Sequence, residues 1–192
     1  MKLLLDACVL YPTVLREILI GAARAGFYQP LWSERILEEW ARAAARLSPP
    51  DEVIARGEIA LLKAEFPAAC VTPRAGLEAR LHLPDENDIH VLAAAIAGGA
   101  EAIVTENRAD FPRGVLAGEG LDRRDPDGLL WQFWSERPEA MAAVVERVRV
   151  RAEALSGQPQ PVRALLKRAR LPRLGKALGA GPGPARGGMN GR

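Results

Sequence analysis

The sequence lacks any run of about 18 apolar residues, so it contains no candidate membrane span. Its apolar N-terminal run, Lys2–Leu5, is interrupted by Asp6 and is too short for a signal peptide. There are only two cysteines, Cys8 and Cys70, and both lie in apolar, strand-like segments. That setting predicts small buried side chains rather than a disulfide or metal ligands. From these absences we expect a cytoplasmic protein with no attachment to a membrane.

The sequence also lacks a glycine-rich loop of the kind that binds nucleotide phosphates. Gly98 and Gly99 are adjacent, but they follow a helical segment and predict its C-terminal end. No internal repeat is present. Only two histidines occur, so a metal site in this chain would be built from oxygen ligands, which favours Mg²⁺ or Mn²⁺ over Zn²⁺.

The chain has enough residues for a substantial hydrophobic core, with 192 residues of which 48% are hydrophobic. Its charge is distributed unevenly. Residues 137–192 hold 12 Lys or Arg against three Glu, a net charge of +9, whereas residues 1–136 hold 14 against 21, a net charge of −7. An acidic body and a basic C-terminal part indicate different partners, with cations suited to the first and phosphates to the second.

Strand-like and helix-like segments alternate along the first two thirds of the chain, which predicts an α/β fold: a three-layer α/β/α sandwich with a central parallel sheet. We expect a domain over residues 1–125, a helical basic extension over 126–178 and a disordered tail over 179–192, rich in Gly and Pro. The predicted strands are residues 3–7, 28–32, 69–72 and 102–105, with a weak fifth strand near Leu121. Predicted helices include residues 13–25, 34–47, 51–64, the segment from Asp88 to Gly98, and two helices after Asp125.

Acidic residues stand at strand ends and helix starts of this predicted fold. Asp6 closes the first strand, and Asn107 and Asp110 follow the fourth. Asp88 lies in the first turn of its helix and points towards the apolar side, which is costly for an unpaired carboxylate. Glu39 lies on the shoulder of the apolar arc of helix 34–47, whereas Glu38 lies on the solvated face.

Strand ends and helix starts on one edge of a parallel sheet converge in space, so we expect Asp6, Glu39 and Asp88 to approach one another there. Carboxylates at such short distances repel one another unless a bound cation or a shared proton compensates their charge. With Mg²⁺ or Mn²⁺ bound, such a site can activate water and stabilise charge on a phosphate.

Four segments resemble the motif blocks of PIN-domain ribonucleases, especially the VapC-like toxins of prokaryotic toxin–antitoxin pairs. They are Leu3-Leu-Leu-Asp-Ala-Cys-Val-Leu, Ser33-Glu-Arg-Ile-Leu-Glu-Glu, Asp85-Glu-Asn-Asp and Val104-Thr-Glu-Asn-Arg-Ala-Asp-Phe. Each block alone is a weak signal, but the four occur in the right order and spacing over about residues 1–125.

The resemblance implies a metal-dependent endoribonuclease with catalytic and metal-binding acids at Asp6, Glu39 and Asp88. The next acidic position of the family falls on Asn107, and the resemblance allows Asp110 to share the role of that position. The amide at Asn107 therefore weakens the expectation of a second metal ion more than that of the first. The implied partners are an RNA substrate and a cognate antitoxin protein, and a homodimer is compatible with them.

Several residues near these blocks have two readings. Asp85 is better explained as the N-cap of the next helix than as a ligand, and His90 as a surface histidine. Thr105 either donates to Asp6 or only ends its strand. The basic residues of the C-terminal segment, Arg163, Lys167, Arg168, Arg170 and Arg173, either contact RNA or form a solvated helix face. We expect this segment to serve RNA binding more than folding. The alternative is that Leu165, Leu166, Leu171 and Leu174 pack onto the acidic body of the protein, with the charges facing water.

Two other functions compete with a nuclease. A phosphatase with an aspartyl nucleophile would need a second carboxylate two residues after Asp6, where Cys8 stands. A catalytically weak or inactive PIN-like module that binds RNA or protein is the stronger alternative, and Asn107 supports it. The inward position of Asp88 and the presence of Glu39 favour catalysis.

Overall fold

The structure, a computed structural model, describes residues 1–179, in which the chain forms two compact units that divide after Pro126. The tail predicted over residues 179–192 lies outside the described residues, apart from Gly179, which ends a helix. Within residues 1–179, no helix is both long and apolar enough to cross a membrane.

The first unit is built on a four-stranded parallel sheet with the strand order β2-β1-β3-β4. The strands are β1 (Lys2–Leu5), β2 (Gln29–Leu31), β3 (Ala102–Val104) and β4 (Asp122–Arg124). Leu4 of β1 pairs with Leu31 on one side and with Ile103 on the other. Residues 3–5 are completely buried, as expected of a central strand covered on both faces.

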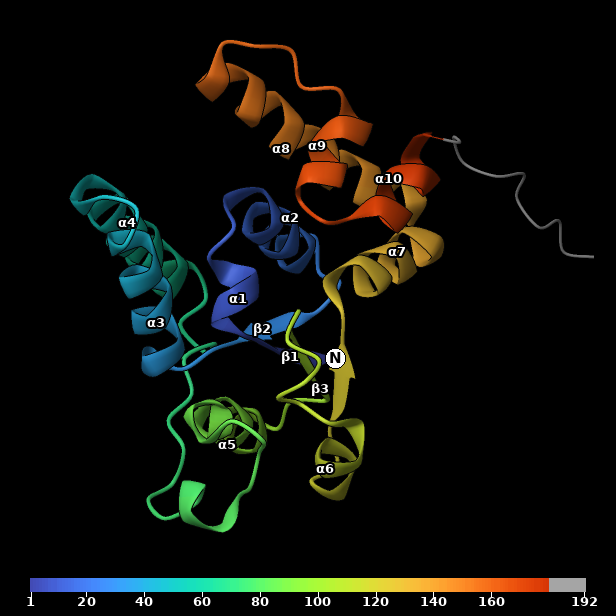
Figure 1. The fold of residues 1–192 in the computed structure, drawn as a ribbon. Helices are drawn as coiled ribbons and strands as arrows, with labels where there is room; N and C mark the ends of the chain where they lie inside the picture. Colours follow the sequence, from blue (N-terminus) through green and yellow to red (C-terminus); the bar gives the residue numbers. More distant parts are fainter. Residues whose placement is uncertain (180–192) are drawn as a thin grey trace, which may run out of the picture. The chain divides into compact units, whose positions relative to one another are not determined.

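Helices cover both faces of this sheet, which confirms the predicted α/β fold. Figure 1 shows α1 and α2 on one side of the strands and α5 and α6 on the other. The helices of the first unit are α1 (Ala7–Leu10), α2 (Thr13–Arg24), α3 (Glu34–Ala45), α4 (Pro49–Glu65), α5 (Ile89–Gly98) and α6 (Arg113–Gly118), with 3₁₀ turns η1 (Glu78–Arg80) and η2 (Glu86–Asp88).

Three predicted element boundaries were wrong. The segment 69–72 forms only an isolated bridge between Cys70 and Trp32, because it lies at the sheet edge and Pro73 has no N–H to extend the pairing. The first strand ends at Leu5, so Cys8 lies in α1 rather than in a strand. Helix α4 begins at Pro49, not after Pro50, because proline is well suited to the first helical turn and Ser48 supplies the cap.

The C-terminal end of α5 fixes the position of that helix against the sheet. Gly99 has φ of 63° and caps the helix in the left-handed conformation, as the Gly98-Gly99 pair predicts. A Cβ atom on Gly98 would lie 2.7 Å from Cδ1 of Leu31, so the helix approaches β2 more closely than a larger residue permits. This close packing holds the opposite end of α5, where Asp88 and His90 lie.

The second unit is helical, with α7 (Pro126–Glu136) starting at its boundary and followed by α8 (Pro138–Ser156), α9 (Val162–Arg168) and α10 (Pro172–Gly179). Leu165, Leu166, Leu171 and Leu174 are at most 2% exposed. The buried carboxylate of Asp127 accepts hydrogen bonds from the backbone N–H groups of Arg173 and Leu174, at 2.9 and 3.0 Å, and so caps α10. The C-terminal segment therefore takes part in folding, because its four leucines are buried and its helix α10 is capped from α7.

Candidate active site

The site lies where the strand order reverses. From β1 the chain leads to β2 on one side of it, and β3 pairs on the other side. In open parallel sheets, ligands bind outside the carboxyl ends of the strands at such a switch point. Asp6 follows β1 and Thr105 follows β3, so both stand at this position. The backbone N–H of Asp6 donates to the carbonyl of Val104 at 3.2 Å, which ties the two strand ends together.

Asp6 is 7% exposed and its carboxylate is held by two donors. Oδ2 accepts from Oγ1 of Thr105 at 2.7 Å and from Sγ of Cys8 at 3.1 Å. Burial, followed by the charge of Asp6, raises the pKa of the Cys8 thiol to about 12, so Cys8 stays protonated and keeps donating. Thr105 therefore orients Asp6 rather than merely ending a strand, and Cys8 is a hydrogen-bond donor rather than simply a small apolar residue.

Three further carboxylates gather at the N-terminal end of α5. One oxygen each from Asp85, Asp88 and Asp110, here called the carboxylate cluster, lies within 4.8 Å of the other two. Nδ2 of Asn107 donates to Oδ2 of Asp88 at 3.3 Å and also to Oδ2 of Asp110. The amide at position 107 therefore links two acids of the cluster.

Asp85 has two roles in the structure. Its Oδ1 accepts from the backbone N–H of Asn87 at 2.9 Å, which confirms that it caps the turn η2. Its carboxylate also belongs to the carboxylate cluster, which the N-cap interpretation does not include. Asp88 itself stands at the N-cap position of α5, one residue before its first turn.

The carboxyl group of Asp88 is partly buried among like charges. Burial, and then the negative charges of Asp6, Asp85 and Asp110, raise its pKa from 3.8 to about 6. Each of these causes disfavours the ionised carboxylate, and a divalent cation among the acids would reverse the effect of the like charges.

This shift predicts how stability depends on pH in metal-free protein. Between pH values of about 4 and about 6, Asp88 keeps its proton in the folded protein but loses it when unfolded. The folded state therefore binds more protons, and the contribution of Asp88 to the free energy of unfolding falls as the pH rises through this range. In thermal melts with chelator, Asp88→Asn should gain stability relative to wild type from pH 4 to pH 7. A difference that stays constant with pH would contradict the assignment.

Glu39 occupies a different position from the other acids. Among the described residues it is not part of the carboxylate cluster. Its Oε1 lies 2.8 Å from Nε2 of His90 and 3.5 Å from Nε of Arg35. His90 is 3% exposed, so the prediction of a surface histidine was wrong. The reason is that α5 packs with residues 91–95 completely buried, which draws His90 into the interior with them.

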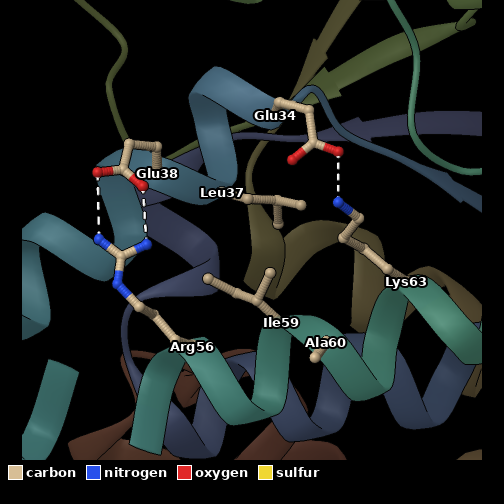
Figure 2. A pocket seen from close by; sticks show the side chains of 7 residues that line it. All are labelled: Glu34, Leu37, Glu38, Arg56, Ile59, Ala60 and Lys63. Atoms are coloured by element: carbon tan, nitrogen blue, oxygen red, sulfur yellow. Dashed lines mark hydrogen bonds and ion pairs between the residues drawn. The ribbon is translucent and has the colours of Figure 1, made fainter. Parts of the chain in front are cut away.

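Glu38, the neighbour of Glu39, points away towards α4. Figure 2 shows it facing Arg56 between α3 and α4, with Glu34 facing Lys63 at the other end. The groove that these residues line has a volume of about 430 Å³. Hydrogen bonds from Arg56 and then Arg42 lower the pKa of Glu38 to about 2. Ion pairs thus stand at both ends of this groove, and no member of the carboxylate cluster lines it. The sequence preference for Glu39 over Glu38 as the inward acid agrees with this arrangement.

The comparisons with known proteins come down to one match. A family model described as "PIN domain" matches residues 2–109, more than half of the chain. The match includes Asp6, Glu39, Asp88 and Asn107 and ends one residue before Asp110. No curated protein and no solved structure matches the chain.

Proposed function

Since the chain belongs to the PIN-domain family, we propose that it is a metal-dependent endoribonuclease that hydrolyses RNA phosphodiester bonds. The observation that carries the proposal is the carboxylate cluster beside Asp6 at the switch point of the sheet, where the pKa of Asp88 is raised to about 6. Within residues 1–179 no ion pair with Lys or Arg is found for these acids, and acids this close are unfavourable unless a cation is bound.

The donor set fits Mg²⁺ or Mn²⁺. Oxygen ligands bind Mg²⁺ at about 2.1 Å, so two ligand oxygens on one ion are up to about 4.2 Å apart. The separations in the carboxylate cluster, within 4.8 Å, are close to that limit. Asp85, Asp88 and Asp110 would hold the ion, with Asp6 beside them. Glu39, whose carboxylate lies at His90, would be a further acid of the site on α3. A bound ion supplies an activated water and stabilises charge on the phosphate.

The protein's own groups prepare this site before any ligand arrives. Thr105 and Cys8 fix the orientation of the Asp6 carboxylate through hydrogen bonds at 2.7 and 3.1 Å. Asn107 does the same for Asp88 and Asp110. Fixed ligands lose little entropy when the ion and the phosphate bind, which is what pre-organisation contributes to catalysis.

We further propose that the protein acts in the cytoplasm as the toxin of a toxin–antitoxin pair, with a cognate antitoxin protein as its partner and a homodimer as one possible assembly. This rests on the resemblance of its four motif blocks to VapC-like toxins. A small DNA-binding protein encoded in the adjacent reading frame would support this part of the proposal, and its absence would count against it.

A non-catalytic PIN-like binding module is the second candidate, and Asn107 is the observation that favours it. An amide stands where the resemblance expects an acid, and it is hydrogen-bonded to the two neighbouring carboxylates. In that case the protein would bind RNA or a protein partner without cutting RNA.

The test is RNA cleavage by the purified protein, freed of any partner. We expect cleavage of single-stranded RNA with Mg²⁺ or Mn²⁺ and none with excess chelator, because the acids need the ion for catalysis. Restoring the metal after chelation should restore cleavage. Binding of RNA without cleavage under all metal conditions would favour the binding module instead.

A further inference from the structure

His90 is a buried polar residue whose ring nitrogens have no well-directed hydrogen bond within the described residues. It is 3% exposed, and its Nε2 lies 2.8 Å from Oε1 of Glu39, within the distance of a hydrogen bond. Its charge also acts on Asp88, so the ring lies between the two acids' elements, α3 and the start of α5. Leaving a buried donor unpaired costs about 1–3 kcal/mol, so a residue with only a packing role would be apolar here.

The neighbours of His90 in α5 support this point. Val91, Leu92 and Ala93 are completely buried and apolar, so the turn of α5 that carries His90 is fixed in the interior of the first unit. A donor on a buried helix next to a more exposed acceptor favours one position of that acceptor.

Glu39 is the more exposed partner of the two. Its side chain is 36% exposed on α3, and it also lies 3.5 Å from Arg35, which is one turn earlier on the same helix and 53% exposed. Exposed pairs of this kind contribute little and do not hold a glutamate in one rotamer. Within residues 1–179, His90 is therefore the buried group that can keep the Glu39 carboxylate at α5 rather than in solvent or against Arg35.

We propose that His90 is a positioning residue that holds the carboxylate of Glu39 beside the N-terminal end of α5. The inference deepens the proposed function and rests on it in so far as Glu39 serves the metal site. His90 acts through Glu39 and is given no contact with metal or RNA. The interaction joins α3 to α5, so it also determines how two elements far apart in the sequence meet at the site.

The expected consequence of losing His90 is weaker metal binding. Residues that orient a metal ligand typically change metal affinity by about 10- to 100-fold when removed. For His90→Leu we therefore expect the Mn²⁺ concentration that gives half-maximal binding to rise by about tenfold or more. At saturating Mn²⁺ the cleavage rate should recover most of its wild-type value, because the ion then holds Glu39 in place.

The experiment compares His90→Leu, His90→Gln and His82→Leu in the full chain. Mn²⁺ binding is measured by titration calorimetry, RNA cleavage as a function of Mn²⁺, and folding by thermal melting with chelator. Gln retains an N–H donor and should recover part of the affinity. His82 is the other histidine of the chain and is exposed, so His82→Leu is the matched control and should bind Mn²⁺ like wild type.

Two further variants make the result decisive if His90→Leu does not fold. Glu39→Gln should lower Mn²⁺ affinity, and adding it to His90→Gln should cause less than the sum of the two single effects, as expected for groups that act together. Wild-type affinity in His90→Leu, or additive effects of the Glu39 and His90 changes, would overturn the inference. Wild-type protein that binds Mn²⁺ but cuts no RNA would instead contradict the proposed function, and the binding data would still decide the role of His90.

Discussion

An Asp88→Asn variant is expected to lose metal-dependent RNA cleavage by at least about a hundredfold, the effect of removing one pre-organised charge-stabilising group from an active site. Asp88 faces Asp6, Asp85 and Asp110, whose charges act on it directly, so it stands at the centre of the acidic site. The substitution keeps the shape of the side chain and removes the charge that a divalent ion needs. Asp6→Asn should have a similar effect, since its carboxylate is already oriented by Thr105.

The metal-free melting temperature separates this result from unfolding. Asp88→Asn removes a repelled charge, so at pH 7 it should melt at the wild-type temperature or higher. Glu86→Gln is the matched control, because Glu86 is an exposed acid of the same turn η2 outside the carboxylate cluster. Equal cleavage by wild type and Asp88→Asn would mean that the activity belongs to a contaminating nuclease or that the site is misassigned.

Truncation after Ser156 is expected to destabilise the second unit by several kcal/mol. It removes four leucines that are at most 2% exposed, and burial of each leucine side chain contributes about 1.5–3 kcal/mol before entropy is counted. It also leaves the buried carboxylate of Asp127 without the two N–H groups it accepts from. Thermal melting of the truncated and full chains measures the effect, and an unchanged melting temperature would contradict it.

The truncation therefore cannot isolate a role in RNA binding, but a charge variant can. Replacing Arg163, Lys167 and Arg168 by Gln leaves the four leucines in place and changes only exposed positions. If the basic segment contacts RNA phosphates, affinity falls and the slope of log affinity against log salt flattens by up to about 2, at roughly 0.7 for each single-strand phosphate contact. Unchanged affinity and slope would assign the segment to folding alone.

The parts of the site that the sequence predicted are those with a local signal. Asp6 ends a continuous apolar run, and a residue in that position must stand at the end of a central strand. Asp88 opens a small-residue helix, and Asn107 follows another short buried run. Each of these signals lies within a few residues of the chain, so the order of strands and helices and the edge at which the acids gather follow from the amino-acid pattern.

The errors arose where the outcome depends on segments far apart in the sequence. The pairing of residues 69–72 failed because Pro73 limits an edge position with only one neighbour, β2. Thr105 gave no local reason to choose between its two roles, and its bond to Asp6 spans 99 residues. The local sequence around Asp85 predicts an N-cap, and the structure confirms that cap. Its membership of the carboxylate cluster depends on Asp110, which lies in the loop after β3 and is far away in the sequence.

His90 is the clearest case of a residue whose position depends on segments far apart in the sequence. A histidine two residues after an acidic cap is ordinary on a helix surface, and nothing near it in the sequence indicates burial. The sequence by itself determined the α/β class and the edge of the sheet at which Asp6, Asp88 and Asp110 lie, because apolar periodicity shows which residues face the core. Only the tertiary structure decided that His90 meets Glu39, that Thr105 and Cys8 hold Asp6, and that the basic segment has a buried leucine side. Those contacts depend on which helices and strands pack together, and the periodicity of one segment does not predict which other segment it will contact.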